Sequence, residues 1–260
     1  MKEFALVTGA SQGLGKSFAT ELSRRGISSI LVSLPGQGLE DFAMELQNEW
    51  NIEVHHYETD LTDKNNIIRL TEWVNRNFNL FLLINNAGCG GSKSFTDASI
   101  DYIERILLLN VMATSILTHQ LLPNMLALPK AYILNISSMA AYTPTGYKTV
   151  YPASKAFVHH FSRGLSEELK NTNVVVSVTN PGAMKTNADV TERINKQGIF
   201  GKLTLLDTEK AACKCLDRLF KKDRVILLNP LSWTAMHLVP RWLRQKVITG
   251  VIRKGEIETV

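Results

Sequence analysis

The chain has 260 residues, of which 45% are hydrophobic and 20% are charged. This composition supports a sizeable folded core and excludes disordered and collagen-like chains. The formal net charge is +5, from 29 basic and 24 acidic residues. Because the basic residues are spread along the chain and no recognition motif accompanies them, we expect no nucleic-acid partner.

No targeting or membrane segment is predicted. The first strand begins at Glu3 or Phe4, and no charged and apolar leader with a cleavage site precedes it, so a signal peptide is not expected. The longest apolar runs, such as Ile106–Leu109, are too short to span a bilayer. Three cysteines cannot form a disulfide framework, which suits a reducing compartment, so we expect a cytoplasmic protein. Cys213 and Cys215 point to different faces of a predicted helix, so we expect no metal site.

Strand and helix patterns alternate along the chain. The predicted strands are Phe4–Thr8, Ser29–Ser33, Ile52–Tyr57, Leu80–Asn85, Ala131–Ser137, Val174–Thr179 and Arg224–Leu228. The predicted helices are Leu14–Arg25, Leu39–Trp50, Lys64–Phe78, Ile100–Leu128, Val150–Lys170 and Asp207–Phe220. This order predicts a single α/β domain, with a doubly wound parallel sheet of about seven strands and helices on both faces. Ligands of such folds bind beyond the carboxyl ends of the strands.

A glycine-rich turn follows the first predicted strand and reads Thr8-Gly9-Ala10-Ser11-Gln12-Gly13-Leu14-Gly15. Its glycines allow a tight turn and a close approach to a phosphate. The start of the next helix offers unpaired N–H groups and a positive dipole end to an anion. An ordinary glycine-rich loop is the alternative, and the spacing GxxxGxG differs from the GxGxxG of longer dehydrogenases.

Tyr151 and Lys155 form a pattern suited to carbonyl reduction, which needs a proton donor at the substrate oxygen. A Tyr hydroxyl, with a pKa of about 10, serves better when a nearby cation favours the phenolate. The two residues are four apart and share one helix face. Pro152 fits only in the first turn, so Tyr151 lies at the helix start. Ser138 would hold the substrate oxygen from the end of a strand, with Ser137 as the alternative.

These features and several others resemble the short-chain dehydrogenase/reductase family. The further motifs are Asp60-Leu61 after strand three, Asn85-Asn86-Ala87-Gly88 after strand four, Asn110 in the long helix, and Pro181-Gly182 followed by Thr186 after strand six. The resemblance spans roughly residues 4–186. It implies an NAD(P)-binding Rossmann fold and hydride transfer between nicotinamide and a carbonyl or alcohol of a small-molecule substrate.

The resemblance also implies roles for individual residues. The implied catalytic residues are Asn110, Ser138, Tyr151 and Lys155. Lys155 would also bond the nicotinamide ribose, and Asn110 would hold a water in a proton relay. The implied cofactor contacts are Gly9, Ser11, Gln12, Gly13, Leu14, Gly15, Ser33, Asp60, Leu61, Asn86, Ala87, Gly88, Tyr151, Lys155, Pro181, Gly182, Met184 and Thr186. A non-catalytic dinucleotide-sensing protein and an isomerase or dehydratase stay open as alternatives on the same fold.

The loop after the second strand favours NADP(H) over NAD(H). It contains no acidic residue that would accept hydrogen bonds from a ribose 2′-OH and repel a 2′-phosphate. Leu34 stands where many NADP-preferring relatives have Arg. We expect Ser33 and the N–H groups of Gly36–Gly38 to donate to the phosphate, with Lys16 as a further source of charge.

Two C-terminal segments bear on the substrate. The segment from 183 to 206 resembles the variable substrate lid of the family. The tail from 231 to 260 has apolar residues at helical spacing, a break at Pro240 and interleaved basic residues. Such a tail either packs on the domain or a sister subunit, which we favour, or makes peripheral contact with a membrane. With Trp233 and Met236 near the site, a hydrophobic ketone is expected, of 3-ketoacyl, lipid-like or steroid-like type.

Apolar residues on two predicted helices exceed what one helix face beneath the sheet needs. They are Ile103, Ile106, Leu107, Leu117 and Leu121 on one helix, and Phe157, Phe161 and Leu165 on the helix that carries Tyr151. Exposed apolar patches of this kind usually mark interfaces. We therefore expect a homodimer or homotetramer.

Overall fold

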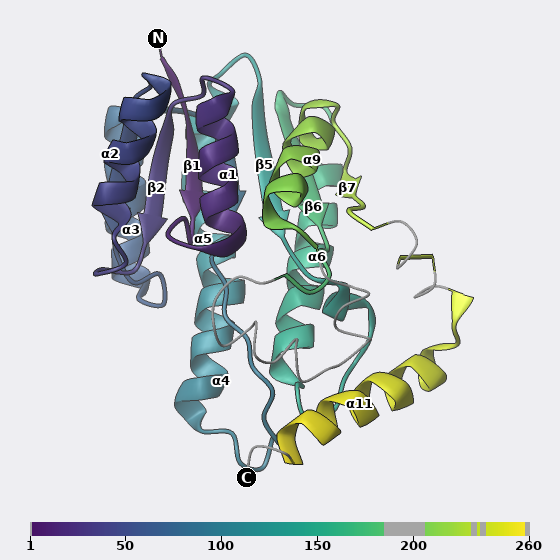
Figure 1. Ribbon diagram of the computed structural model, residues 1–260. Coiled ribbons are helices and arrows are strands. Elements are labelled where there is room, and N and C mark those ends of the chain that lie inside the picture. Colours follow the sequence, from purple (N-terminus) through teal and green to yellow (C-terminus); the bar gives the residue numbers. More distant parts are fainter. Residues whose placement is uncertain (1, 185–205, 230–232, 235–237, 258–260) are drawn as a thin grey trace.

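The computed structural model describes residues 2–184, 206–229, 233–234 and 238–257. Its centre is one sheet of seven parallel strands (Figure 1). The strands are β1 (Glu3–Thr8), β2 (Ser29–Ser33), β3 (Val54–Glu58), β4 (Asn79–Asn85), β5 (Ala131–Ile136), β6 (Val174–Thr179) and β7 (Val225–Ile226). Their order is β3-β2-β1-β4-β5-β6-β7, which runs outward in both directions from β1 and β4. The predicted doubly wound fold is confirmed.

Helices cover both faces of the sheet. They are α1 (Gly13–Arg24), α2 (Leu39–Trp50), α3 (Lys64–Asn77), α4 (Ile100–Leu107), the π-helix η1 (Leu108–Ala113), α5 (Thr114–Leu126), the 3₁₀-helix η2 (Met139–Tyr142), α6 (Val150–Glu168), α9 (Thr208–Phe220) and α11 (Arg241–Ile257). Helices α1, α2 and α9 pack on one face, and α3 and α5 pack on the other. Helices α4 and α11 lie beyond the carboxyl ends of the strands (Figure 1).

Alternation along the strands fills the two cores. In β1, Ala5 and Val7 join the core with α1, α2 and α9, whereas Phe4 and Leu6 join the core with α3 and α5. Successive side chains of a strand point to opposite faces, and a parallel sheet covered on both faces reads as a continuous apolar run. This double burial explains why the strand patterns were clear in the sequence.

Several predicted boundaries differ from the structure by one or two residues, and two elements differ in a way that matters here. The last strand was expected at Arg224–Leu228 but comprises only Val225–Ile226. The helix expected at Ile100–Leu128 ends at Leu126 and is wound as a π-helix over Leu108–Ala113. A π-turn takes one extra residue, is rare, and occurs mostly at functional sites.

We predicted that no segment is long and apolar enough to cross a membrane. By length and composition alone, this prediction was also wrong. Among the described residues, the helical stretch Ile100–Leu126 passes that test, with a mean hydropathy of 1.4. In the fold, its α5 half is a core helix, because Leu117, Leu121 and Met125 are buried against the sheet. Core helices of this type meet the same length and hydropathy criteria as membrane spans.

An ion-pair cluster joins α1 to α9. The Glu21 carboxylate accepts hydrogen bonds from Arg24 at 2.7 and 2.8 Å and from Arg25 Nε at 2.7 Å. Arg25 also donates to Asp217 on α9 at 2.8 Å. Glu21 is only 8% exposed. Hydrogen bonds from Arg24, and then from Arg25, lower the pKa of the Glu21 carboxyl from 4.5 to about 2 against the opposing effect of burial.

Glu21→Gln is expected to lower the free energy of unfolding at pH 7 by about 1–3 kcal/mol, because a charge-assisted network loses its anion. The depressed pKa means that Glu21 stabilises the fold fully above pH 4.5, and that this contribution is lost as the pH falls toward about 2. Urea titrations across this pH range measure both effects. Glu72→Gln is the matched control, because Glu72 pairs with Arg76 at an exposed position and should cost less than about 1 kcal/mol. Equal losses in the two variants would contradict the account.

Candidate active site

The loops with the predicted site residues meet at the carboxyl edge of the sheet. The turn after β1 is fixed directly to the loop after β4. The Thr8 hydroxyl accepts hydrogen bonds from the backbone N–H groups of Asn86 at 3.0 Å and Ala87 at 2.9 Å. In return, the Asn86 amide donates to the carbonyls of Thr8 at 2.9 Å and Gly9 at 3.2 Å. These bonds hold the two loops together at the point where the strand order reverses.

The glycine turn is tight because two of its residues have no side chain. Gly9 has a φ of +66°, which favours glycine, and an added Cβ would lie 3.0 Å from Ala87 Cα. A Cβ on Gly15 would lie 1.9 Å from the Gly9 carbonyl oxygen and 2.6 Å from Asn86 Nδ2. The first turn of α1 therefore packs directly on the loop.

This turn fits the phosphates of a dinucleotide. The side chain of Gln12, the residue before α1, accepts no hydrogen bond from the first backbone N–H groups of the helix. Ser11 and Gln12 line the same turn, and Gly13 has a φ of +54°. Leu14 is buried in the core and anchors the helix start. Uncapped N–H groups and a positive helix end are the features that bind phosphate in such folds.

Tyr151 and Lys155 lie in the first turns of α6, as predicted. The helix begins at Val150, so Pro152 falls in its first turn. Lys155 is 6% exposed, and its Nζ donates to the carbonyl of Ile136, the last residue of β5, at 2.9 Å. Burial lowers the pKa of Lys155 from 10.5 to about 8. Tyr151 is half-buried, and Lys148 Nζ lies 4.9 Å from the centre of its ring.

The two serines after β5 have different environments. Ser137 is 2% exposed, and its hydroxyl donates to the backbone carbonyl of Lys155 at 2.7 Å. Ser138 is half-buried and caps the start of the 3₁₀-helix η2, where its hydroxyl oxygen accepts from Ala140 N at 3.1 Å. Ser137 thus fixes α6 to β5, whereas the Ser138 hydroxyl donates to no acceptor among the residues that the structure describes.

Asn110 lies in the π-helix and is 1% exposed. Its Nδ2 donates to Cys89 O and to Ser154 Oγ, and its Oδ1 accepts from Cys89 N, all at 2.9 Å. Ser154 in turn donates to the carbonyl of Tyr151 at 2.8 Å. Asn110 therefore connects the loop after β4 to the start of α6.

Glycines in the loop after β4 allow Asn110, Tyr151 and Lys155 to pack closely against this loop. A Cβ on Gly88 would lie 3.1 Å from both Asn110 Oδ1 and Lys155 Nζ. A Cβ on Gly90 would lie 2.5 Å from the ring of Tyr151. Sequence reasoning included Gly88 but missed Gly90, although the glycine pair Gly90–Gly91 directly follows the motif and was a usable signal.

The turn after β6 reaches the same edge. Pro181 is buried, and its carbonyl accepts from Met139 N in η2 at 2.9 Å. Gly182 is half-buried beside it. Met184 is 9% exposed and forms an isolated parallel bridge with Leu206. Thr186 and residues 185–205 of the expected lid lie outside the described residues.

The loops after β2 and β3 lie on the other side of the glycine turn from the loops after β4, β5 and β6. Asp60 is exposed, and its Oδ1 accepts from Thr62 N and Oγ1, both at 2.8 Å. Leu61 is buried. Leu34 is 50% exposed, and the loop Leu34–Gly38 contains no acidic residue, although Glu58 at the end of β3 lies in register with Ser33.

Two of the residues expected to donate to the cofactor 2′-phosphate interact with other groups of the protein. Ser33 is 5% exposed, and its hydroxyl donates to Leu34 O at 3.0 Å. Lys16 Nζ lies 4.5 Å from the centre of the Phe42 ring, where α1 meets α2. The exposed backbone of Gly36–Gly38 is the remaining source of donors among those named in the sequence.

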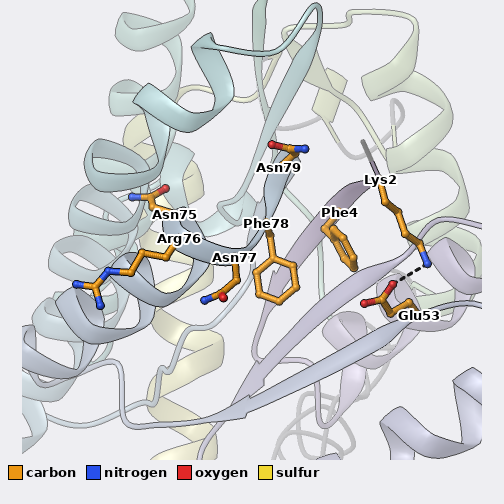
Figure 2. Close-up of a pocket in the computed structure, with 8 residues that line it drawn as sticks. All are labelled: Lys2, Phe4, Glu53, Asn75, Arg76, Asn77, Phe78 and Asn79. Atoms are coloured by element: carbon orange, nitrogen blue, oxygen red, sulfur yellow. Dashed lines mark hydrogen bonds and ion pairs between the residues drawn. The ribbon is translucent and has the colours of Figure 1, made fainter.

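A hollow of about 430 Å³ lies at the opposite, amino-terminal edge of the sheet (Figure 2). Phe4 and Phe78 form part of its wall, and the Lys2–Glu53 ion pair closes one side at 2.8 Å. None of the predicted site residues lines this hollow. The candidate active site is therefore the carboxyl edge, where the predicted residues converge.

Comparison with known proteins agrees with this geometry. A family model described as short chain dehydrogenase matches residues 3–197. The very-long-chain 3-oxoacyl-CoA reductase of Anas platyrhynchos is 35% identical over 184 residues, which are 68% of this chain and 58% of that enzyme. The chain thus spans less than two thirds of the length of this relative.

Solved structures resemble the chain over nearly its whole length. The bulky-bulky ketone specific alcohol dehydrogenase from Comamonas testosteroni has a TM-score of 0.78 and 26% identity, covering 95% of this chain and 93% of its own. A short-chain dehydrogenase from Sphingobium yanoikuyae in complex with NADPH has a TM-score of 0.79 and 26% identity, covering 96% of each chain. A Burkholderia phymatum protein in complex with NAD has a TM-score of 0.81 and 22% identity, covering 91% and 92%, and shows the fold alone.

Gly15→Ala is expected to weaken dinucleotide binding at least about tenfold and to lower the melting temperature, because the added methyl group collides with backbone at Gly9. Nucleotide fluorescence titration and thermal melting measure the two effects. Gly164→Ala in α6 is the control, since a Cβ there meets nothing within 4 Å. Parent-like binding by Gly15→Ala would show that the turn does not hold the cofactor.

Proposed function

Since the chain belongs to the short-chain dehydrogenase family, we propose that it reduces the carbonyl group of a hydrophobic ketone with a nicotinamide cofactor. The observation that carries this proposal is the convergence of Tyr151, Lys155 and Asn110 around the Gly88–Gly90 loop. A retired enzyme or a pure nucleotide sensor would not need this arrangement beside the glycine turn. When bound, the cofactor supplies the hydride.

Tyr151 is the proposed general acid. As the carbonyl oxygen gains negative charge, the Tyr151 hydroxyl donates its proton to it, and the Ser138 hydroxyl donates a second hydrogen bond to the same oxygen. In alcohol oxidation the phenolate takes the proton back. We assign this role to Ser138 because Ser137 is buried and already donates to Lys155 O.

Lys155 and Asn110 support the acid. In this proposal the buried ammonium of Lys155 stabilises the phenolate left on Tyr151 and also bonds the cofactor ribose. Asn110 positions Tyr151 through Ser154 and positions the loop after β4 through Cys89. We infer that the remaining lone pair of Asn110 Oδ1 holds the water of the proton relay.

A hydrophobic ketone is the proposed substrate, of 3-ketoacyl, lipid-like or steroid-like type. Burial raises the pKa of Tyr142 in η2, and a hydrogen bond with the Trp233 side chain opposes this shift. This contact between Trp233 of the tail and η2, which follows Ser138, supports a tail that borders the substrate. The names of the duck reductase and the Comamonas dehydrogenase support this substrate class.

We also propose a preference for NADP(H). The loop after β2 offers no carboxylate to repel a 2′-phosphate, and its Gly36–Gly38 backbone is exposed. The NADPH-bound relative supports this preference, and the NAD-bound structure shares only the fold.

The exposed faces of α4, η1 and α6 suit pairing of two copies. Exposed apolar side chains gather there: Ile100 at 73%, Leu107 at 42%, Met112 at 44% and Phe157 at 40%. Ile106, Leu117 and Leu121 are instead buried in the chain's own core. We propose a homo-oligomer through this face, which light scattering at micromolar concentration tests.

Tyr151→Phe is expected to keep the fold and cofactor binding, because only one hydroxyl is removed. Turnover of a ketone should fall by roughly 10²–10⁴, the usual contribution of a positioned general acid. Tyr132→Phe is the matched control, since Tyr132 is a buried tyrosine in β5 away from the site. Turnover by Tyr151→Phe within a few-fold of the parent would remove Tyr151 from its assigned role.

The pH dependence of kcat/KM should report Lys155. Because the pKa of Lys155 is lowered to about 8, its ammonium is the main form below that pH and is lost as the pH rises through it. Reduction should therefore decline above about pH 8. Lys155→Met should turn over slowly and shift this alkaline limb upward, since no cation then stabilises the Tyr151 phenolate. An unchanged limb would contradict the role of Lys155.

Leu34→Asp should reverse the preference for NADP(H), because a carboxylate repels the 2′-phosphate and accepts from a 2′-OH. The ratio of kcat/KM for NADPH to that for NADH measures the change. Met44→Asp is the control, an exposed apolar-to-acid change on α2. A parent enzyme that already prefers NADH by about tenfold, or 1.4 kcal/mol, would show that the cofactor proposal is wrong.

A further inference from the structure

Helix α11 presents an exposed face that combines apolar and basic side chains. Leu238 is 78% exposed and Val239 36%, just before Pro240 begins the turn into the helix. On α11, Trp242 is 69% exposed, Leu243 38% and Val247 50%. Lys246 and Arg253 are exposed as well. Here the apolar–basic face means Leu238, Val239, Trp242, Leu243, Lys246, Val247 and Arg253.

These residues recur so that they lie on one side of the helix. Trp242, Lys246, Gly250 and Arg253 are four, four and three residues apart, and each is exposed. The other side of the helix is turned toward the domain. Ile248, Val251 and Ile252 are half-buried, and the half-buried Thr249 accepts a hydrogen bond from Gly146 N at 3.1 Å through its Oγ1.

The charged residues between Asp223 and Glu256 are all basic. No acidic residue occurs between Asp223 and Glu256, whereas the same stretch contains Arg224, Arg241, Arg244, Lys246, Arg253 and Lys254. A surface that is both apolar and uniformly cationic complements an anionic lipid surface, where apolar side chains enter the boundary of the acyl chains and basic ones meet the headgroups.

A second copy of the chain is a poorer partner for this face. The common symmetric dimer places one patch against itself, which would bring these cations together. The face on α4 and α6 differs, because Asp101 and Glu104 accompany its apolar residues. The two exposed apolar surfaces therefore suit different partners.

We propose that the apolar–basic face of α11 docks the protein on the surface of an anionic phospholipid bilayer. The helix lies flat in the interface and does not cross it. Its inner side is fixed to Gly146, five residues before Tyr151, so docking places the bilayer beside the proposed catalytic edge. That placement suits a lipid-like ketone, and this last point alone rests on the proposed function.

The test is co-sedimentation of the whole chain with vesicles, without substrate or cofactor, so its result is independent of the proposed reaction. We expect binding to phosphatidylcholine vesicles that contain phosphatidylglycerol, little binding to pure phosphatidylcholine, and weaker binding in high salt. Lys246→Glu combined with Arg253→Glu should weaken partitioning at least about tenfold. Trp242→Ser should also weaken it.

Matched controls separate the face from net charge and from general apolar exposure. Lys130→Glu combined with Lys221→Glu makes the same change in net charge at exposed positions away from α11. Phe95→Ser removes a 61% exposed aromatic side chain elsewhere. Both should bind vesicles like the parent, and thermal melting checks that every variant is folded.

Failure of the parent to bind anionic vesicles, or equal binding to neutral ones, would overturn the proposal. Loss of binding in the control variants to the same extent would also overturn it. If vesicles are not bound but Trp242→Ser lowers the molar mass in light scattering, the face is an interface between copies of the chain, and the lipid proposal is wrong.

Discussion

The contact between the turn after β1 and the loop after β4 is the constraint on which the site depends. Thr8 and Asn86 exchange hydrogen bonds across the point where the strand order reverses. This contact is possible only because Gly9 and Gly15 have no side chains to separate the two loops. It sets the position of the helix N-terminus on one side and of the Gly88–Gly90 loop on the other. The proposed phosphate site and the proposed proton donor thus share one scaffold.

The proposed catalytic residues extend this scaffold through buried polar contacts. Asn110 bonds the loop after β4 and, through Ser154, the start of α6. Lys155 is desolvated enough to lower its pKa to about 8, and the Ile136 carbonyl holds its ammonium in place. Buried polar groups are costly unless they are paired, so such a network fixes one arrangement of the elements that it joins.

Much of this arrangement could be predicted from the sequence because its signals are local. Strands β1 and β6 are buried on both faces of the sheet, so each appears in the sequence as a nearly continuous apolar run. The spacing of Tyr151 and Lys155 predicts that both lie on one helix face. Features that depend on contacts distant in sequence could not be predicted. The π-helix at Asn110 leaves no periodic signal, and the packing of Gly90 on Tyr151 joins residues 61 positions apart. The engagement of the Ser33 hydroxyl with Leu34 O is likewise a matter of side-chain rotation that residue type alone does not determine.

The central claim is that this carboxyl edge directs hydride from nicotinamide to the carbonyl carbon of an apolar ketone. Mass spectrometry of the product formed with nicotinamide deuterated at C4 tests it most directly, with 3-ketoacyl thioesters and bulky ketones as substrates. The account predicts an alcohol that carries one deuterium on the former carbonyl carbon, formed when one face of the nicotinamide is labelled and not when the other is. An isomerised or dehydrated product without deuterium, or no product from any apolar ketone with either cofactor, would contradict it.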